Sequence, residues 1–114
     1  MNNLTLAVGG KIGARMGVHV LNVGVAWPDY VFAPAYRLVP LPEIEQYLQA
    51  NHHLPDVPSA AQVQAEGVEL VTMQALLLQK IEELTLHLIE MEHANDDLRT
   101  RLRAVEQQTV SRHD

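Results

Sequence analysis

Side chains able to do covalent chemistry are few in this 114-residue chain. It contains no cysteine, two serines (Ser59 and Ser111) and two lysines (Lys11 and Lys80). Most of its carboxylates lie on one polar, helix-like stretch toward the C-terminus, where no pair of acids stands out as a hydrolytic centre. We therefore predict no catalytic residue and interpret the chain as a protein that is not an enzyme.

The histidines come nearest to a metal site. His52 and His53 are adjacent and Asp56 follows, and these residue types are common metal ligands. Adjacent histidines in a loop more often end a helix and face solvent. His87 and His93 do not have the spacing that places two side chains on one helix face, and we expect both on the surface. We predict no metal ligand and no cofactor.

All aromatic residues fall in one window, and they are Trp27, Tyr30, Phe32, Tyr36 and Tyr47. Trp27 and Tyr30 could stack on sugar rings, which would make this window a glycan-binding surface. The rings also suit the core of a collar packed around an apolar helix. We favour the collar because an apolar helix further along the chain needs such a cover.

The formal net charge of −6 argues against nucleic acid and anionic lipid as partners, because both require clustered lysine and arginine. No stretch approaches the roughly 18 apolar residues of a membrane-spanning helix, so we predict no membrane insertion. The N-terminus, Met1 to Leu4, lacks the layout of a secretory signal and reads like a start placed before a fragment of a longer chain.

Residues 1–26 are rich in glycine and valine. Leu4, Leu6 and Val8 alternate with other residues before two glycines, and further β-branched residues follow between single glycines. This pattern is typical of short strands separated by turns. We predict a β-strand stalk segment whose edges need cover from another element or chain.

Residues 27–67 hold the aromatic rings and all six prolines. Pro42 suits the first turn of a helix, and the apolar spacing after it predicts a helix that ends near Asn51. Ser59 is a suitable N-cap for a second short helix, which Gly67 would stop. The zone therefore predicts a collar with short helices.

Residues 68–110 carry the longest periodic signal. Nine of the twelve a and d positions of a heptad repeat are apolar, and no proline or glycine interrupts them, which predicts a coiled coil. The predicted interface residues are Leu70, Leu77, Ile81, Leu84, Leu88, Met91, Asn95, Leu98, Leu102 and Val105.

The partner of this helix must come from outside the chain, because no second long helix is present to cover the a and d positions. Self-association is the simpler interpretation. Asn95 at an a position is a register device in several oligomeric states, so the heptads leave dimer and trimer open. Residues 76–89 are apolar around most of the helix, so we expect the aromatic window to cover their outer side. Arg101 at g and Glu106 at e of a neighbouring helix could form an ion pair, and a solvated charged face is an equally good interpretation of these residues.

Several runs of sequence resemble a recurrent bacterial C-terminal module that closes large repetitive surface, adhesin-like and tail-fibre-like proteins. The runs are Trp27–Phe32, Leu41–Leu48, His53–Ser59 and Leu77–Leu86, with an upstream run at Leu6–Ala14 that looks like a short β repeat. The resemblance covers about residues 4–93 and keeps these motifs in order. It implies a fibre end made of a β-rich stalk, a collar and a trimeric terminal coiled coil.

The resemblance also implies an extracellular, cell-surface or phage-like location, with the upstream fibre repeats of a parent assembly as partners. A related class of fibre ends cleaves itself with a serine nucleophile and a lysine base. The motif order of that class is missing here, and Ser59 is better placed as a helix cap than as a partner of Lys80.

Together these observations predict an α+β fold. Its parts are a strand stalk at 1–26, a collar at 27–67, a coiled-coil helix at 68–110 and a disordered tail at 111–114. We expect a structural module that trimerises and caps the C-terminal end of a fibrous protein. The alternative is a receptor- or glycan-binding fibre tip that uses the aromatic collar.

Overall fold

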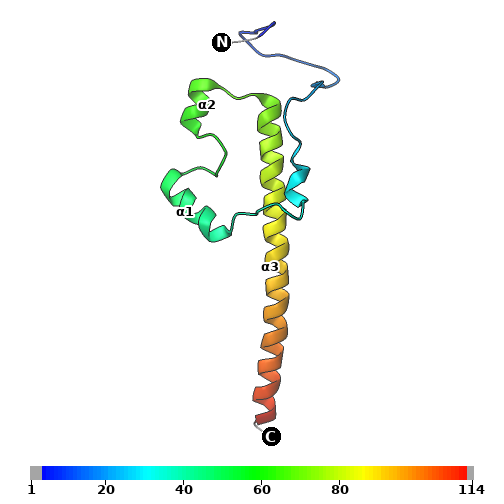
Figure 1. Cartoon of the computed structure of the whole chain (residues 1–114), viewed down its shortest axis with the longest axis vertical. Coiled ribbons are helices and arrows are strands. Elements are labelled where there is room, and N and C mark those ends of the chain that lie inside the picture. Colours follow the sequence, from blue (N-terminus) through cyan, green and yellow to red (C-terminus); the bar gives the residue numbers. More distant parts are fainter. Residues whose placement is uncertain (1–3, 113–114) are drawn as a thin grey trace.

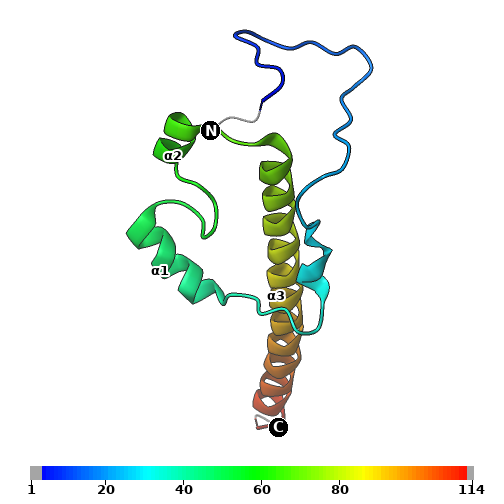
Figure 2. The same ribbon diagram turned by 45° about the horizontal axis from the view of Figure 1, so that its top comes forward.

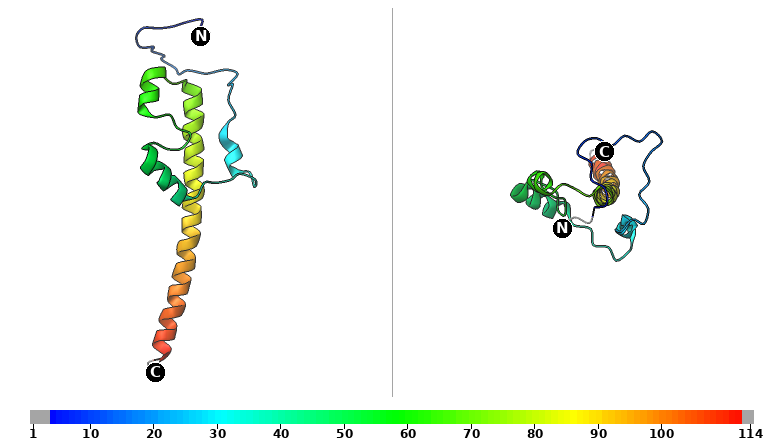
Figure 3. Two further views of the ribbon diagram at one scale, coloured as in Figure 1. Left: turned by 60° about the vertical axis from the view of Figure 1, so that its left-hand side comes forward. Right: turned by 90° about the horizontal axis from the view of Figure 1, so that it is seen from above.

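The computed structural model of the chain describes residues 4–112 and shows an elongated helical molecule 81 Å long. Its elements, in order, are the 3-10 helix η1 (Pro28–Phe32) and the α-helices α1 (Leu41–Asn51), α2 (Ala60–Glu66) and α3 (Leu70–Arg112). The long helix α3 forms the axis of the molecule (Figure 1). η1 lies along one side of α3, and α1 and α2 form an arm on another side (Figure 3).

The predicted β-strand stalk is wrong, and with it the α+β fold class. No strand occurs in residues 4–112, and residues 4–27 run as an extended chain with bends. Figure 2 shows this segment as an open loop beyond the N-terminal end of α3. A strand needs backbone hydrogen bonds to a neighbouring strand, and none of the described chain supplies one. The first three residues of the predicted stalk lie outside the described residues.

The two short helices begin and end where local signals in the sequence predict. α1 has proline in its first turn, and its C-cap residue His52 adopts a left-handed conformation with φ of 61°. At α2, the Ser59 side chain accepts a hydrogen bond from the Gln62 backbone, while the Gln62 side chain accepts one from the Ser59 backbone. Gly67, with φ of 70°, ends α2. Both helices are therefore set by residues at their own ends.

The predicted long C-terminal helix is confirmed as α3. Glu69 precedes it, and its carboxylate accepts hydrogen bonds from the Val71 and Thr72 backbone amides and from the Thr72 hydroxyl. These bonds lower the pKa of Glu69, with the bond from the Thr72 hydroxyl the largest cause. The helix continues through residues 111 and 112, which the sequence placed in a disordered tail, and residues 113–114 lie outside the described part.

The interior of the single chain is small. Val31 and Pro28 of η1 are fully buried against α3, where Ala75 is also buried. Neither α1 nor α2 contains a buried residue. Folding is driven mainly by burial of apolar surface, and this chain leaves most of its apolar side chains exposed.

Candidate functional site

The predicted interface residues form one stripe along α3, and the single chain leaves that stripe open. Its nine apolar members are each between 50 and 63% exposed, and Asn95 is exposed as well. They are Leu70, Leu77, Ile81, Leu84, Leu88, Met91, Leu98, Leu102 and Val105. We call these nine residues with Asn95 the seam. Contiguous exposed apolar surface of this extent is typical of surfaces that bind a partner.

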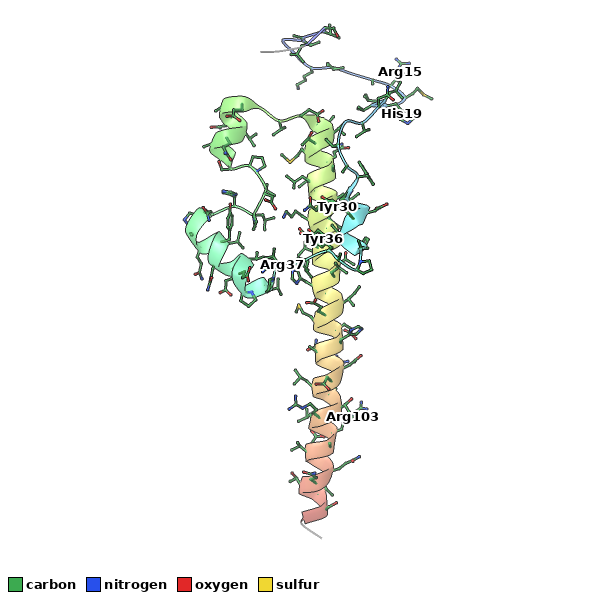
Figure 4. All side chains as sticks on the ribbon, in the orientation of Figure 1. Arg15, His19, Tyr30, Tyr36, Arg37 and Arg103 are labelled. Atoms are coloured by element: carbon green, nitrogen blue, oxygen red, sulfur yellow. The ribbon has the colours of Figure 1, made fainter. Side chains whose placement is uncertain are left out.

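The C-terminal half of α3 is not covered by any other part of the described chain. Every residue from 88 to 111 is exposed, and Figure 4 shows this part of the helix standing clear of the collar. Isolated helices in water are only marginally stable, because their side chains bury little surface. A partner on the seam would supply the burial that this segment lacks.

The five aromatic residues predicted for the collar core are partly exposed in the single chain. Trp27 and Phe32 are each 53% exposed and Tyr30 is 42% exposed, whereas Tyr36 and Tyr47 are half-buried. The residues of this region that the chain buries against α3 are the aliphatic Pro28 and Val31. Whether the rings form a core in an assembly therefore stays a prediction.

Two of the rings reach α3 through their hydroxyl groups. Tyr30 donates a 2.8 Å hydrogen bond to Gln79 Oε1, and Tyr36 donates one of 2.6 Å to Glu83 Oε2. The two rings lie 5.9 Å apart, centroid to centroid, beside the helix (Figure 4). Burial, reinforced by the hydrogen bond to Glu83, raises the pKa of Tyr36 to about 12. Tyr30 thereby fastens η1, and Tyr36 fastens the segment after it, to the outer side of α3.

The residues considered for catalysis have structural partners. Lys80 Nζ lies 3.2 Å from Glu83 and 3.9 Å from Asp56. Ser59 caps α2, and within residues 4–112 no hydrogen bond joins it to Lys80. This arrangement gives Ser59 no base that could activate it.

The residues considered for metal binding point to different neighbours. His52 ends α1, the His53 ring meets the Tyr47 ring edge-on at 5.5 Å, and Asp56 pairs with Lys80. In the described part of the chain no three histidine or acidic side chains gather as a metal site would require.

Two polar residues of α3 are buried without full hydrogen bonding. Glu82 is 8% exposed and His87 is 5% exposed, and neither Glu82 Oε2 nor His87 Nε2 has a hydrogen-bond partner within residues 4–112. Burial is the main reason why the pKa of Glu82 is raised, and the charge of Asp29 adds to it. The expectation that His87 lies on the surface is wrong. The apolar stretch 76–89 around it was the available sign that this turn is covered from outside.

A groove of about 450 Å³ lies between α3 and the segment that leads through α1. Its walls come from residues 36–41, from α1, from residues 54–56 and from α3. Leu41, Ile44 and Leu48 supply the α1 wall, and Leu84 and His87 supply part of the α3 wall. Sequence reasoning missed this groove, because it depends on how residues 33–56 cross α3.

Comparison with known protein families, with curated proteins and with solved structures finds no match to this chain. The resemblance to a fibre-end module therefore stays a prediction from the sequence. None of the helices described here has an apolar stretch long enough to cross a bilayer.

Proposed function

We propose that this chain is an oligomerisation module that self-associates through the seam of α3. The observation that carries the proposal is the seam itself, because its nine apolar residues recur at heptad spacing and are all at least half exposed. In the N-terminal half of α3, η1 covers one side of the helix while the seam stays open. Such an arrangement suits a helix that packs against copies of itself.

The energetics favour association. Fully burying a leucine-sized side chain contributes roughly 1.5–3 kcal/mol, so burying the exposed half of one seam residue contributes on the order of 1 kcal/mol. Nine such residues give on the order of 10 kcal/mol for each chain, from which the entropy cost of association is subtracted. Because every chain of the assembly contributes this burial, the seam is the main source of free energy for association.

A homotrimer at the C-terminal end of a fibrous surface or tail-fibre-like protein is the specific form that we propose. The trimer and the fibre end both rest on the sequence resemblance, with upstream repeats of a parent assembly as neighbours. The proposed role is mechanical: the helices hold three chains together at the end of the fibre, outside the cell or on a phage-like particle.

The test compares two substitutions in the same turn of α3. Leu98→Asp places a carboxylate in the seam, and Thr100→Asp places one on the outer face. Both positions are exposed in the single chain, so neither change disturbs its internal packing. We expect Leu98→Asp to weaken the assembly by at least about 1.5–3 kcal/mol per chain, and Thr100→Asp to leave it nearly unchanged.

Analytical ultracentrifugation measures the outcome. A trimer for the native chain and for Thr100→Asp, with dissociation of Leu98→Asp, supports the proposal. A native chain that sediments as a monomer at every concentration overturns it, and a stable dimer overturns the trimer alone.

A second candidate function is recognition of a glycan or receptor by the collar, and the exposure of Trp27, Tyr30 and Phe32 favours it. Aromatic faces open to solvent can stack on sugar rings. A glycan array probed with the native chain and with Trp27→Ala tests this function. Binding that disappears in Trp27→Ala while the oligomer persists supports it, and binding that is absent from the native chain rejects it.

A further inference from the structure

The groove between α1 and α3 opens directly onto the seam. Leu84, a d residue of the seam, lines the groove together with Lys80 and His87. Lys80 and His87 occupy g positions of the heptad repeat, next to the seam. Any helix that packs on the seam at this level therefore arrives at the mouth of the groove. Figure 4 shows Arg37 between α3 and the start of α1, where the far wall of the groove begins.

The far wall is an apolar helix face without a partner in the described chain. Leu41, Ile44 and Leu48 face the groove, yet no residue of α1 is buried. Leu41 is 43% exposed. α1 begins near α3, and the α1–α2 arm then extends away from it (Figure 1). An amphipathic helix of this kind gains stability only when another surface covers its apolar face.

The charges beside the seam indicate what that surface is. In a parallel coiled coil the g residues of one helix lie beside the following e residues of the next helix. Here His87 at g would face Glu92 at e, and Arg101 at g would face Glu106 at e. Further toward the N-terminus, Met73 at g would face the apolar Leu78 at e. Arg101 and Glu106 therefore match in charge, and Met73 and Leu78 match in polarity.

An antiparallel arrangement would not match. It brings g residues opposite g residues, and the cations Lys80 and Arg101 would then share one interface with no acid at any g position from 73 to 108. Like charges placed opposite each other oppose association.

His87 supplies an independent observation. Its side chain is 6% exposed, its Nδ1 lies 3.8 Å from Glu90, and its Nε2 has no partner in the described chain. A buried nitrogen without a hydrogen bond is costly, so the single chain leaves this part of the α3 wall in an unfavourable state. Nε2 itself is closed to solvent, so a partner in the groove would meet the wall around His87 and not this atom.

We infer that the groove is occupied by α3 of a second copy, so that α1 of each chain clamps its neighbour in a parallel, in-register assembly. The side of the neighbour that enters carries Thr85, the e residue that faces Lys80, and next to it Glu92, the e residue that faces His87. Leu41, Ile44 and Leu48 form the opposite wall of the groove. The inference rests on the proposed self-association and adds the direction, the register and a second interface to it.

Cross-linking between separately prepared chains tests the clamp, and the natural absence of cysteine makes each introduced thiol unique. One preparation carries Leu48→Cys, in the wall of the groove. The other carries Thr85→Cys and an added mass tag. The two are mixed, dissociated and reassembled, and then treated with a short bis-maleimide linker. A product that joins tagged and untagged chains reports a contact between different copies.

The matched control replaces Leu48→Cys with Gln46→Cys, which is exposed on α1 and does not line the groove. We expect the Leu48→Cys mixture to exceed the control by roughly ten-fold or more, since residues held side by side react at a high effective concentration. Ile44→Cys replaces Leu48→Cys if circular dichroism shows that the latter loses helix.

The outcomes separate this inference from the proposed function. Oligomers with the expected cross-link support both. Oligomers that form without a cross-link above the control overturn the clamp and leave the groove to another occupant, while the seam proposal stands. Chains that never associate overturn the proposed function and the clamp together.

Discussion

The Tyr36 hydroxyl donates a 2.6 Å hydrogen bond to Glu83 Oε2, and this contact ties the segment between η1 and α1 to the middle of α3. The same carboxylate group accepts Lys80, whose Nζ lies 3.2 Å from Oε1. Lys80 in turn reaches Asp56 beyond α1. One carboxylate on the outer side of α3 therefore anchors both ends of the segment that carries α1, while the seam remains open to a partner.

Removing the hydroxyl group should loosen this anchor. Tyr36→Phe deletes a hydrogen bond to a charged acceptor, so we expect a loss of roughly 1.5–3 kcal/mol in the free energy of unfolding. Tyr30→Phe is the matched control, because Tyr30 is more exposed and its acceptor Gln79 is neutral, and we expect about 0.5–1.5 kcal/mol there. Urea unfolding at one fixed protein concentration measures both. Equal losses in the two variants would contradict the role given to Glu83.

The raised pKa of Tyr36 makes the stability of this anchor depend on pH. Its pKa is raised from 10.0 to about 12, so the folded chain holds the proton that the unfolded chain releases. The stabilisation is complete below pH 10 and is lost as the pH rises through about 12. Ultraviolet titration of tyrosinate absorbance should show a late step near pH 12 that Tyr36→Phe lacks. A late step that survives in Tyr36→Phe would assign the shift to another ring.

Local signals in the sequence determine the helix ends, whereas the sequence did not predict which distant residues would contact each other. Ser59 and Gly67 delimit α2 through bonds to residues within four positions. The Tyr36–Glu83 bond and the groove join segments that lie far apart in the sequence, and no spacing rule predicts them. The strand prediction failed for a related reason, since β-branched residues favour strands only where a second strand is available to pair.

Glu82 should make the docking of η1 sensitive to pH. Burial, and to a lesser degree Asp29, raises the pKa of Glu82, so the folded chain favours the neutral carboxyl group. The contribution of Glu82 to stability is therefore complete below the ordinary value of 4.5 and is lost as the pH rises through the raised pKa. Glu82→Gln stays neutral, and we expect a higher melting temperature than the native chain at pH 7, with the difference shrinking toward pH 4.

Thermal melts from pH 4 to pH 8 test this expectation, with the exposed Glu66→Gln as the control. Melting temperatures of Glu82→Gln and the native chain that stay parallel across this range would contradict it. A pH-dependent difference in melting temperature of the same size between Glu66→Gln and the native chain would also contradict it.

Ser59 should stabilise α2 through its cap. Ser59→Ala removes the acceptor for the Gln62 backbone amide, and such caps contribute about 1 kcal/mol. Because α2 has no buried residue, the loss should appear as local opening rather than global unfolding. Hydrogen exchange at the Gln62 and Val63 amides should speed up several-fold, while Ser111→Ala leaves these rates unchanged. Unchanged exchange in Ser59→Ala would show that the cap does not limit opening.

Asn95 should set the register of the assembly at a cost in stability. It occupies an a position among apolar neighbours, and a polar residue there restricts the pairing of helices while it weakens them. Asn95→Ile adds apolar surface to the seam, so we expect the assembly to gain roughly 1.5–3 kcal/mol per chain and to populate more than one oligomeric state.

His93→Ile, on the exposed outer face two residues away, is the control and should change neither property. Sedimentation equilibrium measures the oligomeric states, and thermal melts at a fixed protein concentration measure the stability of the assembly. A single state with unchanged stability in Asn95→Ile would place Asn95 outside the interface, because an apolar residue added to a buried seam must strengthen it.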